Sequence, residues 1–176
     1  PIVAYTDNDV IADKNWLKEI VNAFKSGVVG VEGKIRTDPK RTLFSNAPEN
    51  LNGNKFIGAN SAYLKDIILK ELYDEKMNFW REDTDFAFRA MNHGKIVFAE
   101  KAEIYHPLRE DPPKSVFRYL SFIKNDWICA SKHWKKFWKY FGAGMLKDAM
   151  KSIAIWVYLL ILIFMFWKDI MWAFVV

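Results

Sequence analysis

The stretch that decides the fold is Ile2-Val3-Ala4-Tyr5-Thr6-Asp7-Asn8-Asp9. Residues 2–6 are apolar or β-branched and predict a buried strand, and an acidic trio follows at once. In open α/β sheets, ligands bind just beyond the carboxyl ends of the strands. Two carboxylates one residue apart at such an edge supply hard oxygen ligands for a divalent cation. The segment therefore predicts an α/β fold with a cation site at a strand end.

The acidic trio also has simpler explanations. A calcium-binding EF-hand loop needs Asp or Asn at its fifth position, Gly at its sixth and Glu at its twelfth. These positions hold Ile11, Ala12 and Lys18 here, which excludes that loop. A plain turn remains open, because Asp and Asn favour the loop after a strand. The tripeptide alone does not separate a turn from a cation site.

A second acidic cluster and a late histidine lie further along the chain. Glu82-Asp83-Thr84-Asp85 begins a predicted helix that ends near Gly94, and His106 follows a predicted strand. Acids in a first helical turn are favoured by the helix dipole alone. Asp85 and Arg89 are four residues apart, which favours an ion pair. Structural and catalytic interpretations of these residues both stay open, and His93 and His133 are predicted to be ordinary surface histidines.

The apolar pattern of the first 110 residues predicts alternating strands and helices. A helix after Asp13 is expected to place Trp16, Leu17, Ile20, Val21 and Phe24 on one face, and to end near Gly27. Residues 37–54 are rich in turn formers and predict an irregular loop. Further strands are predicted at 28–31, 95–98 and 102–105, with a short helix at 64–72. Residues 55–60 predict the end of a strand that leads into a turn.

Composition divides the chain into three zones: 1–110, 111–151 and 152–176. The net charge is +5, and nine Lys or Arg against two acids lie between Lys114 and Lys151. This zone predicts basic amphipathic helices at a membrane surface, although its apolar face can equally pack on the first zone. No nucleic-acid motif accompanies the basic residues. The apolar face is at Phe117, Leu120, Ile123, Trp127, Ala130, Trp134, Phe137 and Phe141.

The last zone is an apolar run. Residues 153–167 contain no charge, and Lys168 and Asp169 interrupt the run before it continues to residue 176. Fifteen residues fall short of the roughly 20 that span a bilayer. A truncated membrane segment, half of a helical hairpin and a buried soluble helix all fit this pattern. If the segment spans a membrane, the basic zone before it belongs on the cytoplasmic side.

Four segments, in this order, resemble the inverting family 2 glycosyltransferases of the GT-A fold. Residues 3–9 resemble the metal-binding DxD segment of that family, and residues 56–63 are similar to its acceptor-side loop. Residues 73–94 resemble its block of acids followed by Arg and Gly, and Tyr105-His106-Pro107 matches its late histidine. The resemblance covers about residues 2–107. It implies that residues 1–110 are the C-terminal portion of a GT-A domain (a Rossmann-like fold) whose nucleotide-binding strands lie further upstream.

The resemblance implies a transfer of a hexose from a nucleoside-diphosphate sugar to a lipid-linked or cell-surface glycan, at a membrane. Mn²⁺ or Mg²⁺ held by Asp7, Asp9 and His106 would offset the charge of the departing diphosphate. Asp83 is the predicted general base. The predicted substrate contacts are Asp7, Gly58, Asn60, Trp80, Glu82 and Arg89.

Two other functions stay open. A module of the same fold without turnover would bind glycan or anionic lipid at a membrane surface, and its acids would only cap helices and form turns. A metal phosphoesterase is less favoured, because two-metal sites need more ligands than this chain offers.

Cys129 is the only cysteine, so no intrachain disulfide forms.

Overall fold

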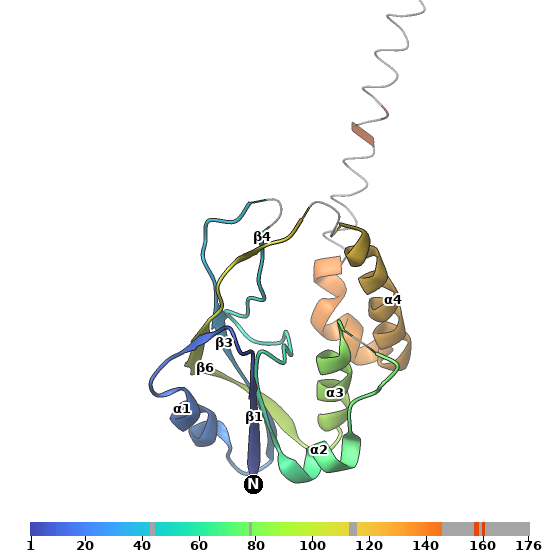
Figure 1. Ribbon diagram of the computed structural model, residues 1–176. Coiled ribbons are helices and arrows are strands. Elements are labelled where there is room, and N and C mark those ends of the chain that lie inside the picture. The colour runs from blue at the N-terminus through green and yellow to red at the C-terminus, as the bar shows by residue number, and fades with distance from the viewer. Residues whose placement is uncertain (43–44, 78, 113–115, 146–156, 159, 161–176) are drawn as a thin grey trace, which may run out of the picture. The chain divides into compact units, whose positions relative to one another are not determined.

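The computed structural model describes residues 1–42, 45–77, 79–112 and 116–145, together with 157, 158 and 160 (Figure 1). The chain divides into two units, residues 1–136 and residues 137–176, and each is described by itself. The prediction for residues 152–176 falls almost wholly outside the described residues. Among the residues that are described, no helix combines the length and apolar character needed to cross a membrane.

The first unit is a mixed α/β fold built on a five-stranded sheet with the strand order β1-β5-β3-β6-β2. The strands of this sheet are β1 (Ile2–Thr6), β2 (Ile11–Ala12), β3 (Val28–Arg36), β5 (Asn60–Leu64) and β6 (Lys95–Tyr105). A separate pair joins β4 (Ser45–Asn46) to β7 (Arg109–Glu110). The helices are α1 (Trp16–Ala23), α2 (Lys65–Glu71), α3 (Glu82–Ala90) and α4 (Val116–Lys132).

The strand pairing places two segments at one edge of the sheet. The β1 strand is antiparallel to β5, with Thr6 opposite Asn60, so the end of β1 adjoins the start of β5. The two-residue strand β2 is antiparallel to the far end of β6, with Ile11 opposite Tyr105. Residues 7–10 therefore run across the end of the sheet from β1 to β6. Of the pairings within the described sheet, the one between β3 and β6 is parallel.

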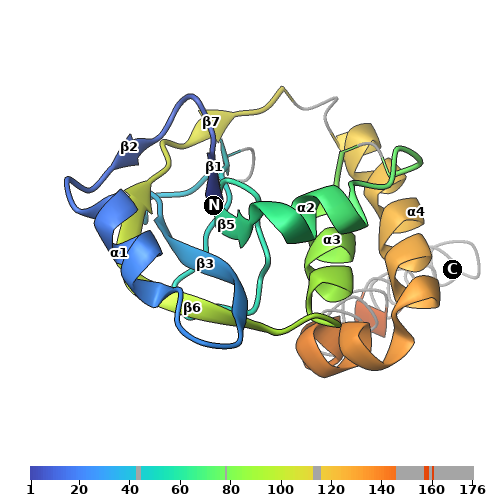
Figure 2. The same ribbon diagram turned by 90° about the horizontal axis from the view of Figure 1, so that it is seen from below.

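Helices cover both faces of the sheet (Figure 2). On the α1 face, Ile20 packs with Val31 and Ala62, and all three are fully buried. On the opposite face, Tyr63 packs against Phe86 of α3. Successive residues of a strand point to opposite faces, which is why neighbours on β5 serve different cores.

The predicted elements are confirmed in type more often than in extent. The helix predicted at 64–72 is α2, and the one predicted from residue 82 is α3, which ends earlier than expected, at Ala90. The two predicted strands at 95–98 and 102–105 are one strand, β6, whose register against β3 shifts between Gly33 and Lys34. The strand end predicted within 55–60 is wrong, because β5 begins only at Asn60, but the predicted turn is present at residues 58–59.

The predicted apolar face of α1 is too wide. Ile20 is fully buried, but Leu17 and Val21 are 58% and 53% exposed. Trp16, Ile20 and Phe24 follow one another at four-residue steps and make the contact with the sheet. Four-residue steps trace a single narrow stripe on a helix, so the flanking apolar residues remain in solvent.

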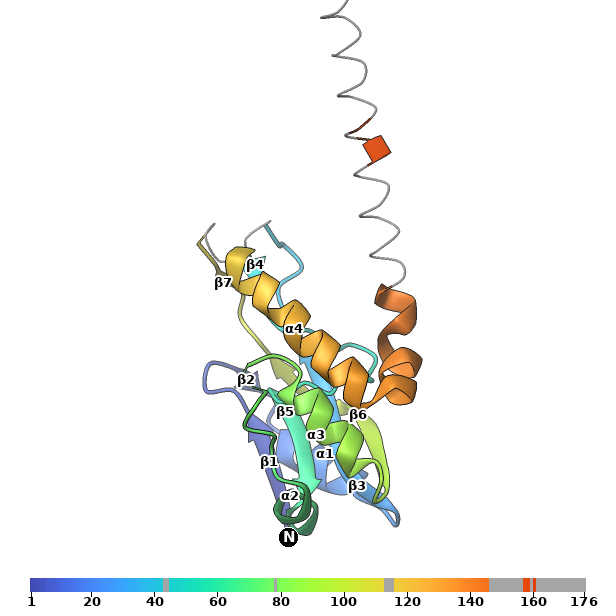
Figure 3. The same ribbon diagram turned by 90° about the vertical axis from the view of Figure 1, so that its right-hand side faces the viewer.

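Helix α4 lies alongside α3 (Figure 3) and buries only part of the stripe that the sequence singled out, including Ala130. Its buried side chains include Phe122, Asn125 and Cys129, whereas Ile123 and Trp127 are 63% and 73% exposed. Packing of the predicted stripe on the first zone is therefore wrong for Ile123 and Trp127. In the second unit, residues 137–145 are helical, and the rings of Phe137 and Phe141 lie 5.3 Å apart.

Candidate metal and catalytic site

Three predicted metal ligands converge at one end of the sheet. Asp7 and Asp9 follow β1, and His106 follows β6, yet one ligand atom from each lies within 4.8 Å of the other two. The crossing of residues 7–10 to β2 explains this, because the pairing of Ile11 with Tyr105 draws Asp9 toward His106. The cluster can hold a metal ion.

The tautomer of His106 suits a metal ligand. Its Nδ1 lies 2.9 Å from the carbonyl oxygen of Pro107, which only accepts, so we assign the hydrogen to Nδ1. The lone pair of Nε2 then faces Asp7 Oδ2 at 3.3 Å and Asp9 Oδ1 at 3.8 Å. His106 is buried, and this carbonyl bond fixes the ring as partners of metal-binding histidines commonly do.

One carboxylate oxygen of Asp9 lacks a hydrogen-bond partner within the described part of the chain and could coordinate a cation. Asp9 Oδ1 is buried and has no hydrogen-bond partner among the described residues. A buried carboxylate oxygen without a partner is costly, and a bound cation removes that cost. Two carboxylates and an imidazole suit Mg²⁺ or Mn²⁺, and the nitrogen ligand favours Mn²⁺. The residues present therefore fit a divalent cation.

Arg109 is a member of this site that the sequence analysis missed. Its guanidinium donates to the other oxygen of Asp9, with Nε 2.9 Å from Oδ2. The hydrogen bond from Arg109 lowers the pKa of Asp9, and the positive charge of Arg109 adds to that effect. The one signal in the sequence was a basic residue three positions after His106.

Asp83 lies in the first turn of α3 with a raised proton affinity. Burial raises its pKa to about 6, with smaller contributions from the negative charges of Glu82 and Asp7. The backbone N–H of Gly58 donates to Asp83 Oδ2 at 2.8 Å and opposes that rise. Of the three predicted metal ligands, Asp7 is thus the one whose charge acts on Asp83.

Gly58 contacts Asp83, which is a different role from the predicted substrate contact. A Cβ atom at position 58 would lie 2.6 Å from Asp83 Oδ2, closer than side chains approach one another. Only glycine therefore allows the backbone to reach this carboxylate.

Glu82 and Trp80 precede Asp83 in the chain and remain candidates for substrate contact. Glu82 Oε2 is buried without a hydrogen-bond partner in the described part of the chain, and burial raises the pKa of Glu82. Trp80 stacks on Phe122 with ring centroids 4.8 Å apart, and its Nε1 donates to Asp126 at 3.0 Å. Trp80 is 41% exposed, so part of the indole faces solvent.

Asn60 is occupied inside the protein. Its amide nitrogen donates to the carbonyls of Lys34 and Ala102 at 2.9 and 2.8 Å. Its oxygen accepts from Trp16 Nε1 at 2.8 Å, and the residue is fully buried. These bonds join three strands to α1, so the predicted contact of Asn60 with substrate is replaced by a role in the core.

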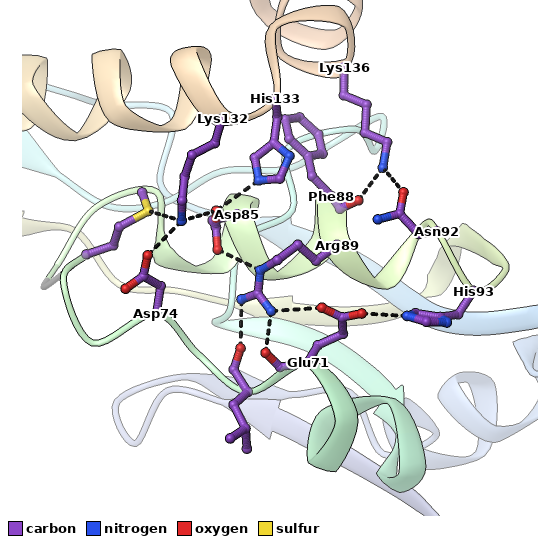
Figure 4. Close-up of polar contacts among 12 residues, drawn as sticks. Glu71, Asp74, Asp85, Phe88, Arg89, Asn92, His93, Lys132, His133 and Lys136 are labelled. Carbon is purple, nitrogen blue, oxygen red and sulfur yellow. Dashed lines mark hydrogen bonds and ion pairs between the residues drawn. The ribbon is translucent and has the colours of Figure 1, made fainter.

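Arg89 likewise belongs to a partly buried ionic network rather than to the predicted substrate site (Figure 4). It donates to Asp85 at 2.9 Å, the expected ion pair along the helix, and to Glu71 at 3.1 Å. Asp85 is completely buried and also accepts from Lys132 and His133 at 2.8 and 2.9 Å. The expectation that His133 is an ordinary surface residue is therefore wrong.

The charge state of Asp85 follows from this network. Burial alone would raise its pKa, but the hydrogen bonds from His133, Lys132 and Arg89 outweigh burial and hold the pKa well below its usual range. The ionised carboxylate therefore links α3 to the end of α4.

Comparison of the chain with protein-family models and with curated proteins gives no match.

Proposed function

We propose that this protein transfers a sugar from a nucleoside-diphosphate donor to an acceptor hydroxyl, with inversion at the anomeric carbon. The observation that carries the proposal is the convergence of Asp7, Asp9 and His106 within 4.8 Å. A second carboxylate, that of Asp83, has a pKa raised to about 6, to which the charge of Asp7 contributes. The ordered motifs of residues 2–107 support a GT-A fold for residues 1–110. The mixed α/β sheet agrees with that fold class at the coarser level.

The metal cluster supplies the donor side of the reaction. A divalent cation bound there would offset the negative charge that develops on the leaving diphosphate. Asp7 and Asp9 contribute carboxylate oxygens, and His106 contributes Nε2. Arg109 is 63% exposed, so it can leave Asp9 and donate to a diphosphate oxygen instead.

Asp83 supplies the acceptor side. Its carboxylate takes the proton of the acceptor hydroxyl while that oxygen bonds to the anomeric carbon and the bond from that carbon to the diphosphate breaks. A pKa of about 6 leaves Asp83 mostly ionised at neutral pH and more basic than an exposed aspartate. Glu82, its neighbour in the chain, and the partly exposed Trp80 are the proposed acceptor contacts.

Donor turnover in the presence of Mn²⁺ or Mg²⁺ tests the reaction. The purified protein is incubated with a panel of nucleoside-diphosphate hexoses, and release of the nucleoside diphosphate is measured with and without glycan or lipid-linked acceptors. We expect metal-dependent release that is lost in Asp9→Ala and Asp83→Asn and kept in Asp66→Asn, an exposed carboxylate of α2. Full activity in either of the first two variants would remove the role assigned to that residue. Metal-free binding of glycan without turnover would favour the non-catalytic module.

We also propose an anionic membrane surface as a partner, with the site on its cytoplasmic side. Ile123 and Trp127 lie one helical turn apart on α4 and are strongly exposed, and the exposed Lys124 adjoins them. An apolar and aromatic face flanked by cations is typical of interfacial helices. The uncharged run of residues 153–167 follows in the sequence, which supports a lipid partner over a protein one.

Sedimentation with vesicles tests this partner. We expect binding to vesicles that contain anionic lipid, weaker binding to neutral ones, and a reduction in Ile123→Ser/Trp127→Ser. The matched control is Leu69→Ser in α2, which removes a comparably exposed apolar side chain. Equal binding of the double variant and the control would show that α4 is not the docking element.

A further inference from the structure

Glu32 of β3 is a buried carboxylate that the proposed reaction does not use. It is 3% exposed, and within the described residues no Lys or Arg pairs with it. Its oxygens accept instead from Asn50 Nδ2 at 3.0 Å and from three consecutive backbone N–H groups. Those donors belong to Asn54, Lys55 and Phe56, at 2.5, 3.2 and 3.1 Å. The carboxylate therefore organises the loop of residues 53–58.

This loop needs an anchor because its backbone is unfavourable. Asn54 and Phe56 have φ angles of 65° and 54°, in the left-handed region that side chains rarely adopt. Such residues cost roughly 1–3 kcal/mol each and persist only where the surroundings hold them. Convergence of several N–H groups on one carboxylate supplies that restraint, because hydrogen bonds to a charged acceptor are the strong ones.

The far end of the loop touches the proposed base. The ring of Phe56 packs edge-on against Phe88 of α3, with centroids 5.5 Å apart. Two residues later, Gly58 donates its N–H to Asp83 at the start of the same helix. The loop thus bridges β3 and α3, with Glu32 at one end and Asp83 at the other.

We propose that Glu32 is a positioning residue for the proposed transfer reaction: by ordering residues 53–58, it holds the Gly58 N–H on Asp83 and tunes how readily Asp83 accepts a proton. The catalytic part of this inference rests on the proposed function. The structural part, that Glu32 controls the protonation of Asp83, does not.

The groups around Asp83 disfavour its ionised form, so the hydrogen bond from Gly58 has a large effect on its charge state. Glu82 and Asp7 face it with negative charge, and both raise its pKa. Three tyrosines also face it: burial raises the pKa of each, and the negative charge of Asp83 adds to that rise. Among the described groups, the Gly58 N–H is the one that favours the ionised form. The tyrosines are Tyr5, Tyr63 and Tyr73.

The test replaces Glu32 by Gln, which keeps the size and one acceptor but turns an NH₂ group toward the N–H donors. The titration of the Asp83 side-chain carboxyl carbon is followed by NMR in the full chain. We expect the midpoint to rise by about one pH unit, because a hydrogen bond to a charged group is lost. The acid limb of the pH dependence of kcat/KM should move by the same amount. The matched control, Glu49→Gln, removes a half-exposed carboxylate from the same connection and should leave both curves unchanged.

The outcomes separate the two proposals. If Glu32→Gln shifts the titration of Asp83 but the wild-type protein transfers no sugar, the positioning role of Glu32 stands and the proposed function is wrong. An unshifted midpoint in folded Glu32→Gln would overturn the inference and leave Glu32 as a loop anchor only. If that variant does not fold, Asn50→Ala removes one donor from the same anchor. A smaller upward shift is then expected, and no shift would again overturn the inference.

Discussion

Replacement of Asp83 by Asn should stabilise the protein while it abolishes sugar transfer. Burial raises the pKa of Asp83 from 3.8 to about 6, so the folded protein binds a proton that the unfolded chain has released. Stability from this group is therefore fully present below pH 3.8 and is lost as the pH rises through 6. At about 1.36 kcal/mol per pKa unit, the ionised carboxylate costs about 3 kcal/mol at pH 8 and about 1.6 kcal/mol at pH 5. Asn is uncharged and retains an oxygen for the Gly58 N–H.

Urea denaturation of wild type and variant at both pH values measures the effect, because contributions common to both proteins cancel in the difference. The free energy of unfolding of Asp83→Asn should exceed that of the wild type by about 3 kcal/mol at pH 8 and by about half of that at pH 5. Asp66→Asn, in which the replaced carboxylate is exposed, should stay within about 0.5 kcal/mol at both. If the free energy of unfolding does not rise at pH 8, or rises equally at the two pH values, the raised pKa of Asp83 is refuted, and with it the role of Asp83 as general base.

Three further variants probe the site and its support. Gly58→Ala should lower kcat about 100-fold, since its Cβ would lie 2.6 Å from an Asp83 oxygen and displace it; near-normal turnover would show that this contact is dispensable. Asp85→Ala should cost about 3 kcal/mol in urea denaturation, because it removes a counter-charge shared by Arg89 and Lys132 and the hydrogen-bond acceptor of His133; a loss below about 1 kcal/mol would contradict a network that holds the helices together. Arg109→Ala should bind Mn²⁺ several-fold more tightly by calorimetry, as it removes a cation that competes for Asp9; unchanged affinity would place the ion elsewhere.

Local sequence patterns were sufficient to predict most helices and strands, but not the residues that each of them contacts. The strand before Asp7 and the helix that begins at Glu82 follow from apolar spacing and helix-start residues, which act over a few positions. Spacing left two roles open for the stripe on α4, because the helix has two apolar faces and spacing alone does not tell which one packs. Asn60 was misassigned for a related reason, since its three hydrogen bonds reach residues between 26 and 44 positions away in sequence.

By itself, the sequence determined that carboxylates follow the first strand and that acids begin the third helix, because both depend on neighbouring residues. Tertiary structure alone decided that Asp9 meets His106 and Arg109, about 100 positions away, through the short pairing of β2 with β6. It also decided the proton affinity of Asp83, because that depends on burial and on the fields of distant groups. Desolvation and Coulomb interactions act through space, so the linear order of residues carries no direct record of them.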